Sequence, residues 1–107
     1  VLDVRFFMYC EEIDWPWRMR KAGWESWIVP EAVIVHHSGA STKQARPETT
    51  AYLWESRARL YRKHRDPLTR AIVTPLVRRA FSRPPPTDTR EWHAAYARIL
   101  AAWKPSR

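Results

Sequence analysis

Phe6-Phe7-Met8-Tyr9-Cys10-Glu11-Glu12-Ile13-Asp14-Trp15-Pro16-Trp17-Arg18 is the stretch around which the rest of the chain is organised. Three carboxylates, those of Glu11, Glu12 and Asp14, lie here within four positions, among large apolar and aromatic side chains. Acids in such surroundings can have perturbed pKa values, and perturbed acids are common where protons are transferred. The simpler alternative is that acids near a helix start only suit the helix dipole.

The composition of the chain limits its partners and its compartment. The 107 residues suffice for one small domain, and 19 Lys and Arg against 11 Asp and Glu give a net charge of +8. That charge favours anionic partners, namely nucleic acid, anionic lipid headgroups or phosphorylated substrates. The single Cys10 excludes an internal disulfide and a multi-Cys metal site. No secretory signal or long apolar run is visible, so we expect a cytoplasmic location.

Two features of the chain suggest that it packs against further sequence. It has 2 Gly against 9 Pro and 7 Trp, a heavy aromatic load for a small core. It also opens on Val1, without an initiator Met. We therefore expect a fragment of a larger protein.

A first helix is predicted to end at Gly23, a residue well suited to the position after a helix. Pro16 is tolerated in a first turn and costly deeper in a helix, which favours Asp14 as the N-cap. Glu11 and Glu12 would then lie in the loop that precedes the helix.

Two strands are predicted after this helix, over residues 24–29 and 32–37, and the second is apolar on both faces, as in a covered sheet. A small-residue loop over 38–42 follows. Three amphipathic helices are then predicted: Glu48–His64, Leu68–Phe81 and Arg90–Trp103. Pro67 suits the first position of the second of these helices, and Pro75 should kink it.

Four short motifs occur in a fixed order: Arg5-Phe6-Phe7-Met8-Tyr9-Cys10-Glu11-Glu12-Ile13-Asp14 with Arg18, Ala22-Gly23-Trp24, Val29-Pro30-Glu31-Ala32, and His36-His37-Ser38-Gly39-Ala40-Ser41. This order resembles the second half of a family 2 glycosyltransferase, and most of all its rhamnosyltransferase-type members. The family's motifs have the forms Phe-Phe-x-Tyr-x-Glu-Asp-x-Asp-(three residues)-Arg, Ala-Gly-Trp, Val-Pro-x-Ala and His-x-x-Gly-x-Ser. The resemblance covers about residues 2–65.

The resemblance implies an α/β fold, the C-terminal part of a GT-A (Rossmann-like) domain followed by amphipathic helices, helix-rich as a fragment. The implied divisions are the acceptor side of the catalytic domain with its general base (1–65) and a basic amphipathic helix (66–82). A Pro-rich linker (83–89) and a C-terminal helix (90–107) follow.

In the family, the second acid of the acidic pair is the general base, which here is Glu12, where the family usually has Asp. An inverting transfer needs one carboxylate to deprotonate the acceptor hydroxyl as the anomeric carbon is attacked from the opposite face. Glu11 would position the acceptor or hold the loop. Asp14 and Arg18 are four residues apart, and we interpret them as an ordinary helix ion pair that supports the acidic loop.

The donor side of the site is implied less completely. His36 matches the family's histidine near the sugar-nucleotide diphosphate and the divalent metal (Mg or Mn), although one histidine alone makes no metal site. Gly39 and Ser41 would contact phosphate oxygens, or the loop is only a tight turn. The family's Asp-x-Asp pattern and nucleotide-binding half are absent from the 107 residues, so we expect no transferase activity from them alone.

The resemblance thus implies an inverting glycosyltransferase of cell-envelope polysaccharide or glycolipid synthesis. A nucleotide-sugar is the donor, rhamnose being suggested by the resemblance alone, and the acceptor is a hydroxyl, often polyprenyl-linked in this family. Basic residues flank an apolar stripe over Leu68 to Arg83, so this segment contacts anionic lipid at the inner face of the plasma membrane or packs on the catalytic domain.

Two alternatives remain. A basic, Trp-rich chain could bind nucleic acid through phosphate contacts and stacking. Its basic residues are scattered, however, and no nucleic-acid motif is present, so we expect no such partner. The other alternative is a relative that has lost catalysis, since Glu12 replaces the usual Asp and Pro16 stands where the family has an apolar residue or Cys.

Overall fold

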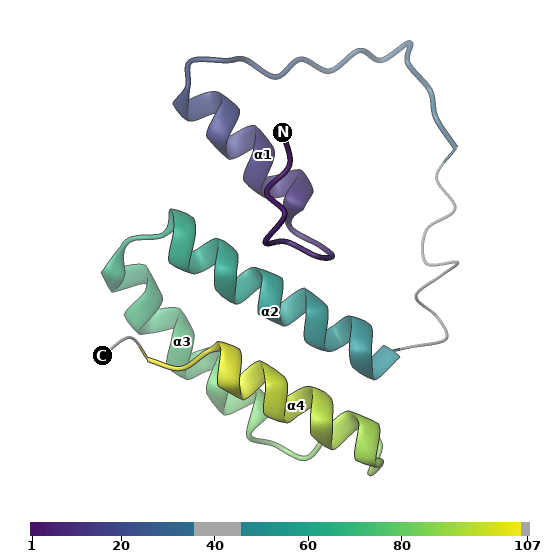
Figure 1. The fold of residues 1–107 in the computed structure, drawn as a ribbon, viewed down its shortest axis with the longest axis vertical. Coiled ribbons are helices and arrows are strands. Elements are labelled where there is room, and N and C mark those ends of the chain that lie inside the picture. Colours follow the sequence, from purple (N-terminus) through teal and green to yellow (C-terminus); the bar gives the residue numbers. More distant parts are fainter. Residues whose placement is uncertain (36–45, 106–107) are drawn as a thin grey trace.

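The computed structural model describes residues 1–35 and 46–105, and within them the secondary structure consists of helices. The helices are α1 (Glu11–Lys21), α2 (Arg46–His64), α3 (Pro67–Phe81) and α4 (Arg90–Ala102). Figure 1 shows α2 in the middle, with α1 and the N-terminal segment on one side of it and α3 and α4 on the other. None of the helices among the described residues is long and apolar enough to cross a bilayer.

The predictions for the three later helices are confirmed to within two residues at each end. Pro67 is the first residue of α3, as predicted, and the Asp66 side chain caps this helix by accepting hydrogen bonds from Thr69 N (2.9 Å) and Thr69 Oγ1 (2.6 Å). Thr89 caps α4 by accepting a hydrogen bond from Trp92 N. The starts of α3 and α4 could be predicted from the sequence because each capping residue bonds to a backbone group only three positions away.

The predicted start of the first helix is wrong. α1 begins at Glu11, and the Cys10 carbonyl accepts hydrogen bonds from Ile13 N (3.2 Å) and Asp14 N (2.8 Å). Pro16 lies inside the helix and lacks the N–H that would bond the Glu12 carbonyl. The loss of one backbone hydrogen bond is offset by the side chains that fix α1 to α2, which no local pattern reveals. Glu11 and Glu12 therefore occupy the first helical turn, not a preceding loop.

The end of α1 follows the prediction. Gly23 has a left-handed backbone (φ 86°), and its N–H donates to Arg20 O at 3.1 Å. Trp24 N–H reaches back to Met19 O at 3.0 Å. This pattern satisfies the last carbonyls of the helix and suits glycine, because other residues adopt positive φ at a cost.

The predicted strands do not form within the described part of the chain. Residues 24–35 are extended, exposed and without a neighbouring strand, with a turn closed by Ala32 N donating to Val29 O (3.1 Å). A strand needs a partner for its backbone N–H and C=O groups, and the described residues contain no other strand that could pair with this segment. Residues 36–37 and the predicted 38–42 loop lie outside the described residues, and the α/β class stays a prediction.

The main core lies between α2 and α4. Ala51 and Ala58 of α2 are buried in one cluster with Ile99 of α4 and with Trp103, which directly follows α4, and small residues allow the two helices to approach closely. Trp103 Nε1 also donates to the Trp54 carbonyl at 2.9 Å. α2 is therefore joined to α4 and the residue that follows it by both apolar packing and a partly buried hydrogen bond.

Arginines close the C-terminal end of α4. Arg62 of α2 donates to Ala102 O at 2.6 Å, and Arg78 of α3 donates to Leu100 O at 2.9 Å. Cations at a helix C-terminus satisfy its last carbonyls and complement its dipole. Part of the chain's positive charge thus has a structural use.

Candidate functional site

The N-terminal segment is fixed along one face of α2. Ser56 Oγ donates to Met8 O at 2.7 Å, Arg59 donates to Arg5 O, and Lys63 Nζ contacts Asp3 Oδ2 at 2.7 Å. Positions 56, 59 and 63 follow helical spacing, so the three donors share a side of the helix. A second cluster of buried residues, consisting of Phe6, Cys10 and Leu60, fills the space between the segment and α2.

A strained turn leads into the two glutamates. Tyr9 (φ 67°) and Cys10 (φ 68°) both have left-handed backbones, which cost roughly 1–3 kcal/mol each in a residue other than glycine. The surrounding contacts hold them there. Burial, followed by the charge of Glu12, raises the pKa of the Cys10 thiol, so Cys10 is suited to packing and not to nucleophilic chemistry.

Asp14 is the most fully buried charged residue of α1, at 0% exposed, and three cationic or imidazole side chains bind it. Its carboxylate accepts from Arg18 Nε at 2.8 Å, Lys63 Nζ at 2.6 Å and His64 Nε2 at 2.7 Å. Burial alone would raise the pKa of Asp14. Hydrogen bonds from Lys63, His64 and Arg18 outweigh the burial and lower the pKa to about 2.

The contact between Asp14 and Arg18 is thus confirmed, but it is more than an ordinary helix pair. Lys63 and His64, at the end of α2, turn it into an anchor between two helices that are far apart in the sequence. The sequence contains only a weak indication that Asp14 connects the two helices. Asp14 follows Cys10 by four positions and precedes Trp17 by three, so it lies on the buried stripe of α1, where a charged residue requires partners.

The two glutamates differ in exposure. Glu12 is exposed, whereas Glu11 is partly buried and its Oε2 atom is buried without a hydrogen-bond partner in the described structure. Adjacent helical residues point about 100° apart, so the two carboxylates do not face one another. Of the predicted acidic pair, Glu12 is the residue more accessible to a molecule arriving from solvent.

The structure does not bear on the donor side of the predicted site. His36, Gly39 and Ser41 lie outside the described residues. Within residues 1–35 and 46–105, no three His, Cys, Asp or Glu side chains are grouped to hold a metal ion. The oxygens of Asp14 are already bound to Arg18, Lys63 and His64. The described residues by themselves therefore do not fit a divalent metal.

The buried Asp14 predicts a specific pH dependence of stability. Because its pKa in the folded chain, about 2, lies below the usual 3.8, its contribution of about 2 kcal/mol is complete above pH ~4. The contribution is lost as the pH falls through about 2. Asp3 and Asp66 also have lowered pKa values, so the readout is the difference between the wild type and Asp14→Asn.

Urea unfolding at several pH values between 6 and 2 measures this difference. We expect the free-energy gap between wild type and variant to shrink as the pH falls. A gap that stays constant over the whole range would show that folding does not lower the pKa of Asp14.

Comparison with known proteins finds a short region of similarity. The chain is 50% identical over 40 residues to N-acetylglucosaminyl-diphospho-decaprenol L-rhamnosyltransferase from Mycobacterium tuberculosis, in strains CDC 1551 / Oshkosh and ATCC 25618 / H37Rv. The matched residues are 37% of this chain and 13% of each relative. No protein-family profile and no solved structure matches the chain. The similarity indicates a glycosyltransferase-like relationship over this stretch.

Proposed function

We propose that this chain supplies the acceptor side of an inverting family 2 glycosyltransferase, with Glu12 as the general base. The observation that carries the proposal is one exposed carboxylate, that of Glu12, in the first turn of a helix whose opposite side is fixed by the buried Asp14. The similarity to rhamnosyltransferases supports transfer as the kind of reaction.

The firm attachment of α1, the helix that carries Glu12, suits general base catalysis. A base must be held within hydrogen-bonding distance of the proton that it removes, and small displacements are costly. Lys63 and His64 stop α1 from rotating about its axis through their contacts with Asp14. Arg18 Nη2 also donates to Val1 O at 2.8 Å and joins the chain start to the same helix.

In the proposed reaction, Glu12 takes the proton of the acceptor hydroxyl. The hydroxyl oxygen forms a bond to the anomeric carbon while the bond to the nucleoside diphosphate breaks on the opposite face. One carboxylate is sufficient, because no covalent glycosyl–enzyme intermediate is formed. Glu11 supports the turn or contacts the acceptor. Since the described residues do not fit a metal, no step of the transfer is assigned to one.

The substrates are proposed from the similarity. The relatives' name specifies an N-acetylglucosaminyl-diphospho-decaprenol acceptor and the transfer of L-rhamnose. For this chain we propose a nucleotide-activated sugar as the donor, rhamnose being the first to test, and a polyprenyl-diphosphate-linked glycan as the acceptor. The residues proposed to meet the donor diphosphate are His36, Gly39 and Ser41.

The stereochemistry of the product tests the proposed reaction. The protein, with any in-frame sequence upstream of Val1 included, is incubated with nucleotide-activated rhamnose and a lipid-linked N-acetylglucosamine acceptor. The anomeric configuration of the product is then determined by NMR. We expect it to be opposite to that of the donor, because attack and departure take place on opposite faces. A product of retained configuration would contradict a mechanism with one carboxylate.

A further inference from the structure

α3 carries apolar residues on two of its sides. Its inner side packs on the core through Val73, Val77 and Phe81. Leu68, Ile72 and Leu76, spaced four residues apart, form an outer ridge and are 72%, 56% and 62% exposed. No element in the described part of the chain covers this ridge. An exposed apolar row of this kind marks a contact surface more often than chance.

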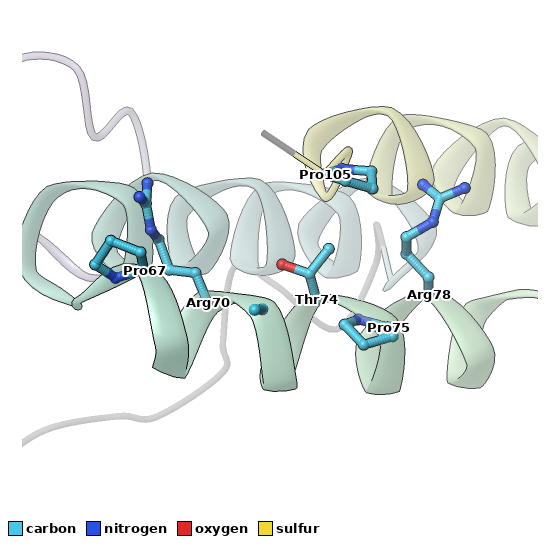
Figure 2. Close-up of a pocket in the computed structure, with 7 residues that line it drawn as sticks. Pro67, Arg70, Thr74, Pro75, Arg78 and Pro105 are labelled. Atoms are coloured by element: carbon cyan, nitrogen blue, oxygen red, sulfur yellow. The ribbon is translucent and has the colours of Figure 1, made fainter. Parts of the chain in front are cut away.

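A cavity of about 600 Å³ lies beside the ridge. Its lining includes Arg70, Thr74 and Arg78 of α3, and Pro105. Figure 2 shows these three α3 side chains rising from the same side of the helix, with Pro105 lying across from them. Pro75 also lines the cavity and adjoins Leu76 of the ridge, so the cavity and the ridge are neighbouring features of one helix.

Positive charge is concentrated at this cavity without an acid among its lining residues. The Nε atom of Arg70 is buried and has no hydrogen-bond partner among the described atoms. Arg62, also close by, has its pKa lowered first by burial and then by the charges of Arg59 and Arg70. α3 itself contains three arginines and no acidic residue. A buried donor without a partner costs free energy, and so does its closeness to other positive charges. A bound anion would accept a hydrogen bond from this donor and reduce the repulsion.

We propose that α3 docks on an anionic lipid surface, where the ridge of Leu68, Ile72 and Leu76 enters the interface and the cavity between Arg70 and Arg78 receives a headgroup phosphate. Charge complementarity identifies this occupant, because the cavity offers guanidinium groups to a phosphate and the ridge offers apolar side chains to the acyl region. A nucleic acid would use the arginines but would leave the ridge in water. The proposal does not depend on the proposed sugar transfer.

The contribution of the arginine is tested by sedimentation with vesicles. Vesicles of phosphatidylglycerol and phosphatidylcholine are compared with vesicles of phosphatidylcholine alone, at low salt. We expect the wild type to bind only the anionic vesicles, and Arg70→Gln to bind them about fivefold more weakly, since a basic residue near such a surface contributes about 1 kcal/mol. Arg90→Gln, an exposed site at the start of α4, removes the same charge and should change binding by less than twofold.

The contribution of the ridge is tested separately. Ile72→Ser combined with Leu76→Ser is expected to weaken binding at least tenfold, because two apolar side chains no longer enter the interface. Ile28→Ser combined with Ile34→Ser alters two apolar residues outside α3 that are even more exposed than Ile72 and Leu76, and it should leave binding unchanged. Circular dichroism checks that each variant keeps its helices.

Three outcomes would overturn the proposal. The first is equal binding of the wild type to neutral and anionic vesicles, or to neither. The second is an Arg90→Gln effect as large as that of Arg70→Gln, which would show attraction by net charge alone. The third is an unchanged affinity of the ridge variant, and the binding of a DNA duplex in place of vesicles would then identify a nucleic acid as the occupant.

Discussion

Replacement of Glu12 by glutamine is expected to lower the turnover number for sugar transfer by roughly 10²- to 10⁴-fold, the usual contribution of a general base. Glutamine keeps the size and the hydrogen-bonding reach of the side chain but cannot accept the acceptor's proton. Donor binding should be spared, because Glu12 acts on the other substrate. The turnover number and the KM for the donor, measured with any in-frame sequence upstream of Val1 included, test both expectations.

Glu91 provides a matched control for this substitution. Like Glu12 in α1, it is the second residue of its helix, α4, and it is exposed. Glu91→Gln therefore reproduces the change in charge and in helix-dipole interaction without touching the proposed site, and should leave turnover unchanged. Turnover retained in Glu12→Gln would refute the base assignment, and an equal loss in both variants would point to an electrostatic effect on the fold.

Replacement of Asp14 by asparagine is expected to destabilise the chain by about 3 kcal/mol, because it removes the common partner of a buried charge cluster. This loss of unfolding free energy should lie at the lower end of the range that is usual when a buried ion pair is broken. Lys63 and Arg18 are 22% and 35% exposed and can turn toward water, whereas His64 is 4% exposed and loses its carboxylate partner. Urea unfolding at neutral pH measures the effect.

Asp88 offers the corresponding control for Asp14. It also contacts a histidine, His93, at 2.6 Å, but the two side chains are 95% and 60% exposed. Asp88→Asn is expected to leave stability nearly unchanged, because exposed ion pairs contribute little. Similar unfolding free energies for the Asp14 and Asp88 variants would contradict the role of Asp14 as an anchor between α1 and α2.

Features encoded by neighbouring residues could be predicted from the sequence. Asp66 and Pro67 mark the start of α3, and Gly23 marks the end of α1, because each acts on backbone groups within a few positions. The exposed Glu12 was also a candidate from the sequence, through the resemblance of its motif.

Features that depend on distant residues could not be predicted. Lys63 and His64 meet Asp14 from about 50 positions away, and no spacing rule connects them. The strained backbone at Tyr9 and Cys10 was missed for the same reason, since it is held by contacts with α2 that include Ser56 bound to Met8. The prediction of the α1 start relied on Pro16 alone and failed because this tertiary anchoring outweighed a local preference.

The two-sided role of α2 has a thermodynamic consequence. Leu60 on one side of this helix packs with Phe6 and Cys10, while Ala58 on another side packs with the core that holds Ile99. Unfolding of α2 would abolish both sets of contacts, so the acidic turn and the α3–α4 hairpin share one folding equilibrium. Any ligand that binds only the folded chain at α3 would therefore also protect the distant turn that carries Glu12 from opening, by mass action and without touching it.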